Sequence, residues 1–244
     1  MTSVSNFRDV SGTGLALPNG ERMAVGVVYR AAKLSTLSGP DSRELAKAGV
    51  SEVIDLRTDS VATRSPDVAI RGAEYHLVNV FAVYSTPAVT YRTAAAAAAH
   101  MEQLNVDFVG EAAQRRKIAT VLKLVAAADG PVVVHCTEGK DRTGWISALL
   151  QLNAGANRDQ VMSEYLKSNQ YRAAVIDAGY RAKLRSSGRT VAAAKRALLR
   201  VEPEYLGAGL DALEAKYNDI AGYLKDGLGL SSATVERLRD RLTA

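Results

Sequence analysis

The chain has 244 residues, of which 47% are hydrophobic, and this is the composition of a globular protein large enough for one sizeable core. No apolar run reaches the roughly 18 residues that a membrane-spanning helix requires, so we expect no transmembrane segment. The net charge of +5 favours an anionic partner. Because no basic tract is interleaved with aromatic residues, we expect no nucleic-acid ligand and a mildly basic surface.

The single cysteine excludes an internal disulfide and fits a reducing compartment. The N-terminus has neither the basic stretch nor the apolar stretch of a signal peptide. We therefore expect a cytoplasmic protein, with export without a signal left open. The residue pattern indicates no cofactor and gives no information on the oligomeric state.

The first third of the chain alternates candidate strands with turns. Residues 25–29, 52–56 and 74–80 are rich in side chains that favour strands. Ser38 is followed by Gly39-Pro40-Asp41, and a capping serine before an early proline predicts the start of a helix. With residues 132–134 as the central strand, we expect an α/β fold whose small, mostly parallel sheet is flanked by helices.

The remaining segments are predicted to be helical. Residues 94–99 are all alanine, the strongest helix former. From residue 145 to the C-terminus the pattern is mainly helical, with a capping box at residues 157–160 and a break before Pro203. The apolar stripes of these helices indicate core rather than a ligand site. We expect residues 1–244 to form a single domain.

The segment around Cys136 carries the strongest chemical signal. Residues 132–134 form a β-branched run, His135 and Cys136 follow, and Arg142, Thr143 and Gly144 begin a buried helix. A loop that leads into a helix N-terminus binds phosphate through its backbone N–H groups. The guanidinium adds a permanently charged fork for two phosphate oxygens, and nearby positive charge favours the thiolate, which is the attacking form. The pattern therefore predicts attack of sulfur on a phosphoryl group through a cysteinyl-phosphate.

Each residue of this loop has an expected role. The backbone from Thr137 to Arg142 is expected to form the anion cradle, with glycines where the chain turns sharply. The Thr143 hydroxyl is placed to hydrogen-bond the sulfur. His135 is expected to lie under the loop, because neighbouring residues on a strand point to opposite faces. The predicted phosphate-binding residues are Thr137, Glu138, Gly139, Lys140 and Thr143.

Other interpretations of this loop fit the residues less well. A buried, inert cysteine is common at strand ends, but it does not explain the fixed spacing of five residue types. A nucleotide-binding loop would need glycine and Ser/Thr where Val134 and Asp141 stand. A structural zinc site would need about four ligands, and one cysteine with three separated histidines does not supply them.

The sequence resembles the cysteine-dependent protein tyrosine phosphatase superfamily. The string HCTEGKDRTG (residues 135–144) is similar to the loop of its bacterial tyrosine-phosphatase-B-like branch, which acts on phosphotyrosine, phosphoserine/threonine and phosphoinositides. The resemblance spans almost the whole chain. The other similar motifs are NFRDV (6–10), VYRAA (28–32), VIDLR (53–57), EYLKSN (164–169) and LGLS (228–231).

The resemblance implies further roles. A helical lid covers the active site in this branch, so residues 85–118 are a candidate lid, with an ordinary packed helix pair as the alternative. Lys140 resembles a lysine that meets additional phosphates in phosphoinositide phosphatases. Asp141 is a candidate general acid, with an ion pair or helix N-terminal anion as the alternative. Asp55 is the rival acid and is more simply interpreted as a structural partner of Arg57 or Arg8.

These observations predict a metal-independent phosphomonoester hydrolase with Cys136 as nucleophile and Arg142 as phosphate clamp. The expected substrate is a phosphorylated protein, a lipid head group or a small-molecule phosphate. The favoured hypothesis is a protein-tyrosine or dual-specificity phosphatase with phosphoinositide activity, and a phosphatase of a nucleotide or sugar phosphate is the alternative. Two other classes stay open: a non-catalytic phosphate-binding pseudophosphatase and a sulfur-transfer or redox protein.

Overall fold

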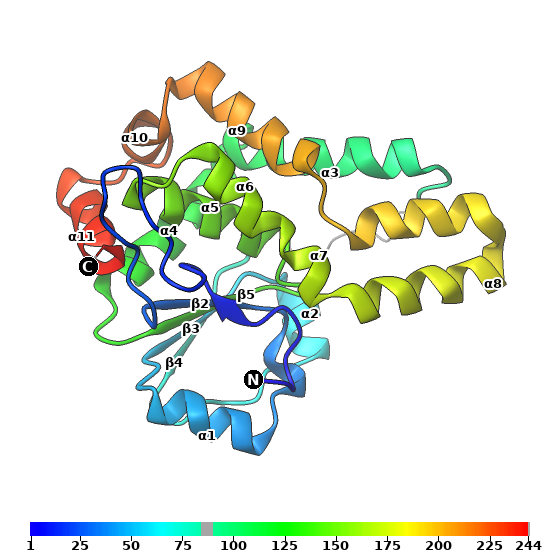
Figure 1. The fold of residues 1–244 in the computed structure, drawn as a ribbon, viewed down its shortest axis with the longest axis horizontal. Helices are drawn as coiled ribbons and strands as arrows, with labels where there is room; N and C mark the ends of the chain where they lie inside the picture. The colour runs from blue at the N-terminus through cyan, green and yellow to red at the C-terminus, as the bar shows by residue number, and fades with distance from the viewer. Residues whose placement is uncertain (84–89, 244) are drawn as a thin grey trace.

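A five-stranded sheet is the framework of the protein, and the computed structural model describes residues 1–83 and 90–243. The strand order is β1-β2-β5-β3-β4, with β1 antiparallel to β2 and the other pairs parallel. This confirms the predicted small, mostly parallel sheet with helices around it (Figure 1). The strands are β1 (Arg8–Asp9), β2 (Val28–Ala31), β3 (Glu52–Asp55), β4 (Glu74–Leu77) and β5 (Val132–His135).

Two strands differ from their predicted bounds by more than one residue. The segment predicted as residues 25–29 pairs only from Val28, because Gly26 adopts a φ of +79° and turns the chain just before it. Similarly, β4 ends at Leu77 rather than at Val80. Val78 and Val80 are buried, so their apolar character reflects core packing beyond the strand and not ladder pairing.

Helices cover both faces of the sheet. On one face, Val53 and Val133 pack in a cluster with Leu45 of α1 (Gly39–Lys47), whose N-cap is Ser38 as predicted. On the other face, a larger cluster contains Trp145 of α5 (Arg142–Ala154). The additional elements around the sheet are η1 (Leu34–Thr36), α2 (Asp59–Arg64), α4 (Ala112–Ala127) and α11 (Ser232–Leu242).

The second half of the chain is helical, as the sequence pattern predicts. The predicted capping box forms at the start of α6, where Asn157 and Gln160 bond each other's backbone N–H groups. Pro203 occupies the first turn of α9. None of the helices in the described residues is both long and apolar enough to cross a bilayer. These elements are α6 (Arg158–Leu166), α7 (Ser168–Tyr171), α8 (Ala173–Leu199), α9 (Pro203–Tyr217), α10 (Ile220–Gly222) and η2 (Tyr223–Gly227).

The segment predicted as a lid, residues 85–118, is in its described part α3 (Ala94–Gly110) and the beginning of α4. Residues 85–89 lie outside the described residues. Helix α3 packs lengthwise against α8 and α9, whereas α4 packs against α5 and α11. In the described part, the arrangement is therefore that of two packed helices with different neighbours.

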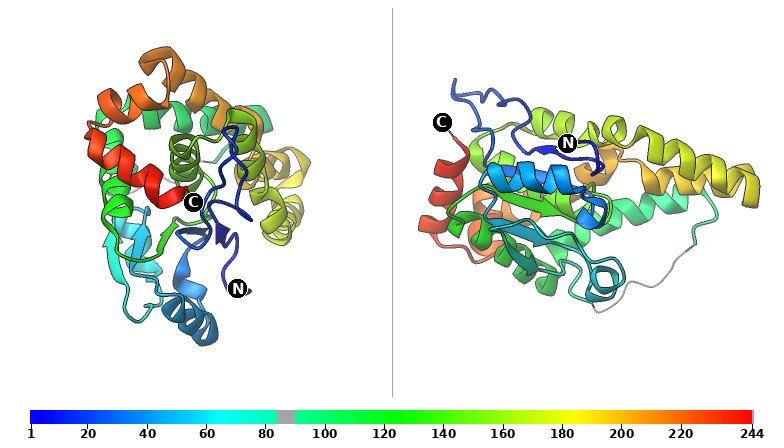
Figure 2. Two further views of the ribbon diagram at one scale, coloured as in Figure 1. Left: turned by 60° about the vertical axis from the view of Figure 1, so that its left-hand side comes forward. Right: turned by 90° about the horizontal axis from the view of Figure 1, so that it is seen from below.

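Helix α8 is a hairpin that projects from the body of the protein beside α3 (Figures 1 and 2). Its helical geometry is interrupted at Gly188, where the backbone has a φ of +80° and a ψ of 176°. The two halves run back along each other. Their ends meet where Arg172, at the start of the hairpin, donates to the carbonyl oxygen of Leu199 at its end. We call residues 173–199 the arm.

Candidate active site

The loop of residues 136–141 lies at the carboxyl end of the central strand, between β5 and α5. Parallel α/β sheets place their ligand sites at this edge. Cys136 is 1% exposed and packs against the apolar core beneath the loop.

The carbonyl groups of the loop face away from its centre. The carbonyl oxygens of Glu138 and Gly139 accept hydrogen bonds from Asn6 Nδ2 at 3.2 and 2.7 Å, and that of Thr137 accepts one from the Lys33 amide at 3.3 Å. Among the described residues, none accepts a hydrogen bond from the amide N–H groups of residues 137–141. These free donors, together with the uncapped N-terminus of α5, form a cradle for an anion.

Gly139 is required by this shape. Its φ is +64°, and a Cβ atom built on it would lie 2.4 Å from the carbonyl carbon and oxygen of Ala31 and 2.6 Å from the amide nitrogen of Ala32. The loop therefore turns directly against the end of β2, where only glycine fits.

Arg142 and Thr143 leave polar atoms unpaired at the start of α5. Arg142 donates from Nη1 to the carbonyl oxygen of Leu56 at 3.1 Å, and its guanidinium lies 4.4 Å from the centre of the Phe81 ring. The Arg142 Nε and Thr143 Oγ1 atoms are buried and have no hydrogen-bond partner among the described residues. The predicted bond from the Thr143 hydroxyl to sulfur is thus not formed here, and both groups are free to bind an anion.

Lys140 differs from the free ammonium group that the sequence suggests. Its side chain is buried, and Nζ lies 2.6 Å from Oδ1 of Asp141. The Asp141 side chain is partly exposed at 18%. The two side chains form one charged pair, so the charge of Lys140 is balanced by Asp141.

Asp55 and His135 belong to a buried network below the loop. Arg57 donates to both carboxylate oxygens of Asp55, at 2.6–2.9 Å, and to Asp67 at 2.7 Å. Burial alone would raise the pKa of Asp55, but the hydrogen bonds from Arg57 and the charge of His135 outweigh it and lower the pKa. Asp55, Asp67 and His135 offer three potential metal ligands, and the Arg57 guanidinium already bonds both carboxylates.

His135 is buried in this network and contacts both Asp67 and the backbone of the loop. Its Nε2 atom is 3.0 Å from Oδ2 of Asp67, and its Nδ1 atom is 3.4 Å from the carbonyl oxygen of Cys136. The imidazole therefore orients the backbone at Cys136 from below, which agrees with the predicted placement under the loop.

Three further residues contact the loop and have no assigned role in the sequence interpretation. Arg30 of β2 is fully buried and donates from Nη2 to the carbonyl oxygen of Gly139 at 2.9 Å. Arg172 forms an ion pair with Glu138 and so joins the loop to the arm. Asn6 and Arg30 lie within the motifs NFRDV and VYRAA, and those motifs were the only signal that could have found them.

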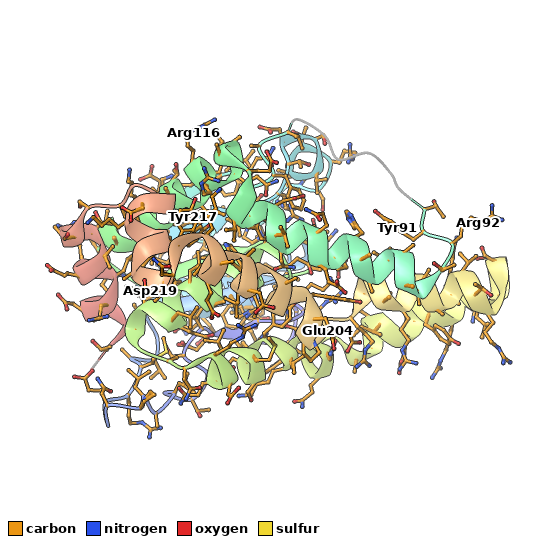
Figure 3. The ribbon with its side chains drawn as sticks, turned by 90° about the horizontal axis from the view of Figure 1, so that it is seen from above. Tyr91, Arg92, Arg116, Glu204, Tyr217 and Asp219 are labelled. Carbon is orange, nitrogen blue, oxygen red and sulfur yellow. The ribbon has the colours of Figure 1, made fainter. Side chains whose placement is uncertain are left out.

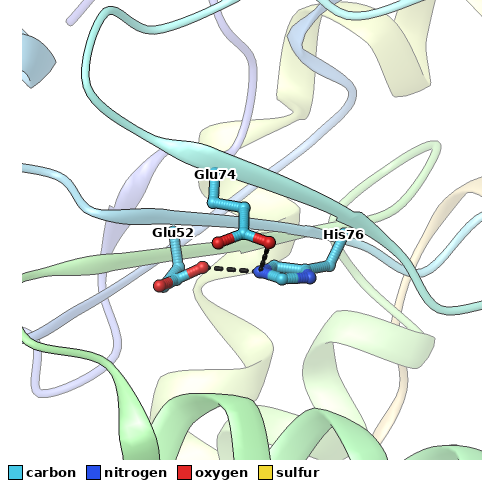
Figure 4. Close-up of side chains that lie close together, drawn as sticks. All are labelled: Glu52, Glu74 and His76. Carbon is cyan, nitrogen blue, oxygen red and sulfur yellow. Dashed lines mark hydrogen bonds and ion pairs between the residues drawn. The ribbon is translucent and has the colours of Figure 1, made fainter.

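A separate polar cluster lies at the opposite end of β3 and β4 (Figure 4). Nε2 of His76 is 2.6 Å from Oε2 of Glu52 and 3.8 Å from Oε1 of Glu74. These residues share one face because Glu52 pairs with Glu74 in the parallel register and His76 follows two residues later. A cross-strand histidine–glutamate contact accounts for the arrangement, and we assign it no ligand.

The α/β fold and the free amide groups of the loop define a candidate anion site at the carboxyl end of the central strand. The sequence profile of the tyrosine phosphatase family matches residues 1–244, and the chain belongs to this family. It is 30% identical to the triple specificity protein phosphatase PtpB of Mycobacterium tuberculosis, over 96% of this chain and 95% of that protein. It is also 31% identical to a provisionally named tyrosine-protein phosphatase of Cupriavidus necator, over 95% and 84% of the two chains. A tyrosine-protein phosphatase of Nostoc commune is 28% identical over 87% and 73%.

Proposed function

We propose that this phosphatase hydrolyses phosphomonoesters without a metal ion, through a cysteinyl-phosphate on Cys136. The free amide groups of residues 137–141 above the buried thiol carry this proposal, because they match the oxygens of a phosphoryl group held over sulfur. Arg142 supplies the charged fork at the helix N-terminus. The barrier is lowered mainly by positioning and by preorganised dipoles.

Asp141 is the proposed general acid. It lies at the rim of the loop, where a leaving group would depart, and it is partly exposed. Asp55 is unsuited to this role, because it is fully buried and bonded by Arg57 on both oxygens.

The Asp141→Asn variant is expected to discriminate between leaving groups. An alkyl phosphate needs the proton because an alkoxide leaves poorly, so we expect its kcat/KM to fall roughly 100-fold or more. With p-nitrophenyl phosphate the fall is expected to stay below about 10-fold, because the phenolate leaves unassisted. Steady-state kinetics on both esters measure this ratio. Equal losses on the two substrates would remove Asp141 from the acid role.

Arg30 is the proposed counter-cation of the thiolate from beneath the loop. Arg30 pairs with Val134 in the sheet register, and Cys136 follows two residues later on the same face. Burial lowers the pKa of Arg30 to about 10, and the negative charge of Cys136 opposes this shift more than any other group. Arg30 forms no ion pair with a carboxylate among the described residues, so the thiolate is the anion best placed to balance it.

Arg30→Met is expected to slow alkylation of Cys136 by iodoacetamide at pH 7 roughly 10-fold, because a nearby cation that favours the thiolate is lost. The other charged or titratable side chains around the loop are unchanged in this variant; they are His135, Glu138, Lys140, Asp141, Arg142 and Arg172. Asn6→Gly is the matched control: it also removes a donor to the Gly139 carbonyl but removes no charge, and glycine tolerates the φ of 60° found at Asn6. Equal slowing of alkylation in both variants would show that loop geometry, and not the charge of Arg30, sets the reactivity of Cys136.

A direct comparison of three phosphate esters tests the substrate class. We propose phosphotyrosine protein as the principal substrate, with phosphoinositide activity supported by the Lys140–Asp141 pair at the loop rim. Phosphate release from a phosphotyrosine peptide, a phosphoinositide and a sugar phosphate should be measured with EDTA present. Efficient turnover of the sugar phosphate alone would favour the small-metabolite alternative.

A further inference from the structure

The positive charge of this protein is concentrated in the arm. Residues 173–199 contain six Lys or Arg and one Asp or Glu, a net charge of +5, and the other 217 residues contain 25 of each sign. The arm therefore carries the whole net charge of the chain. The body of the protein is neutral in formal charge, so the basic surface expected from the sequence lies mainly on the arm.

Asp177 is the one acidic residue of the arm. No Asp or Glu occurs from Ala178 to Val201, a stretch that spans the tip of the hairpin. Among the described residues, no carboxylate forms an ion pair with a cation of the arm; the arm's two flanking arginines, Arg172 and Arg200, pair with Glu138 and Glu202. The positive charges of the arm are thus not neutralised by these ion pairs, and their electrostatic field extends into the solvent.

The tip presents charge and apolar surface together. Arg181, Leu184 and Arg185 follow at helical spacing on one face, and Arg189 comes directly after the turn at Gly188. All four side chains are exposed, and Leu184 is 39% exposed. Views of the molecule show the tip as the point farthest from the sheet, beside Tyr91 and Arg92 (Figures 2 and 3).

We propose that this face of the arm docks on a bilayer surface that contains anionic phospholipid headgroups. Basic side chains with interspersed apolar residues on a projecting helix are the pattern of interfacial membrane binding. The arm has few side chains that would contact bases: it contains no Asn, Gln, His, Phe or Trp, and its single aromatic residue, Tyr180, lies against Arg196 at 5.6 Å.

Docking would also position the active site. The base of the arm is fixed to the loop, because buried Arg172 contacts both Glu138 of the loop and the end of the arm at Leu199. A docked arm therefore holds the loop in a fixed position relative to the bilayer. The inference is independent of the reaction at Cys136, since it concerns headgroups at the tip and not the bound phosphoryl group.

The test is vesicle binding by a charge-neutralised arm. Wild-type protein is expected to bind vesicles of phosphatidylcholine with phosphatidylserine at low salt and to be released at high salt. The triple variant Arg181→Gln, Arg185→Gln, Arg189→Gln is expected to bind roughly 100-fold more weakly, with hydrolysis of p-nitrophenyl phosphate unchanged. The matched control neutralises Arg64, Arg71 and Arg116, which are exposed cations of the body, and it should lose less than about 3-fold.

A probe at the tip gives a second readout. Leu184→Trp should show fluorescence quenching by brominated lipid in anionic vesicles, while the native Trp145 is buried in the core and stays unquenched. Failure of the wild type to bind anionic vesicles, or equal losses in both triple variants, would overturn the proposal. Displacement of the vesicles by a duplex oligonucleotide that binds the arm more tightly would also overturn it, in favour of nucleic acid.

Discussion

Cys136→Ser is expected to abolish phosphatase activity while phosphate binding persists. The hydroxyl of serine is not ionised at neutral pH and cannot replace the thiolate as nucleophile, so kcat should fall by at least about 10,000-fold. The anion cradle is made of backbone amides and Arg142, which the substitution leaves in place. Calorimetric titration with inorganic phosphate is therefore expected to give a dissociation constant within a few-fold of wild type.

The intermediate provides the complementary measurement. Acid quench of wild-type protein during turnover of p-nitrophenyl phosphate should give a phosphorylated peptide that contains Cys136, and the serine variant should give none. Turnover retained by Cys136→Ser would exclude the cysteine mechanism. Rhodanese activity in the wild type without phosphate release would instead support a sulfur-transfer protein.

The core of the site could be predicted from sequence because it is local. A β-branched strand, a thiol and an arginine at a helix start lie within one contiguous segment, residues 132–144, and their geometry follows from the strand–loop–helix connection. The same holds for the sheet and the helix caps at Ser38 and Asn157, where short-range side-chain bonds decide the structure.

What surrounds the loop could not be predicted in this way. Asn6 and Arg30 hydrogen-bond the carbonyl oxygen of Gly139, which is 133 and 109 residues away in the sequence. No local sequence pattern predicts such long-range contacts. The ion pair between Lys140 and Asp141 joins adjacent residues. Sequence alone nevertheless does not distinguish a buried, paired lysine from a lysine that points to solvent. For residues 94–99, alanine propensity predicts a helix and contains no information on its packing against α8 and α9.

Gly139→Ala is expected to damage both the fold and the site. The new Cβ would lie 2.4–2.6 Å from backbone atoms of Ala31 and Ala32, which have no flexible end that can move aside. Together with the unfavourable φ of +64°, we expect a loss of about 3 kcal/mol in the free energy of unfolding. The loop must shift to relieve the clash, so its amides no longer converge on the phosphoryl oxygens and kcat/KM should fall roughly 100-fold or more.

Gly49→Ala separates the clash from the backbone strain. Gly49 has a comparable φ of +76°, and a Cβ atom there would meet nothing within 4 Å. Its cost should be limited to about 1 kcal/mol in urea unfolding, with kcat/KM unchanged because Gly49 follows α1 and lies away from the loop. If the two variants lose the same stability and keep the same activity, the contact between Gly139 and the end of β2 does not shape the loop. A greater loss confined to Gly139→Ala shows that this contact sets the position of the amides over sulfur.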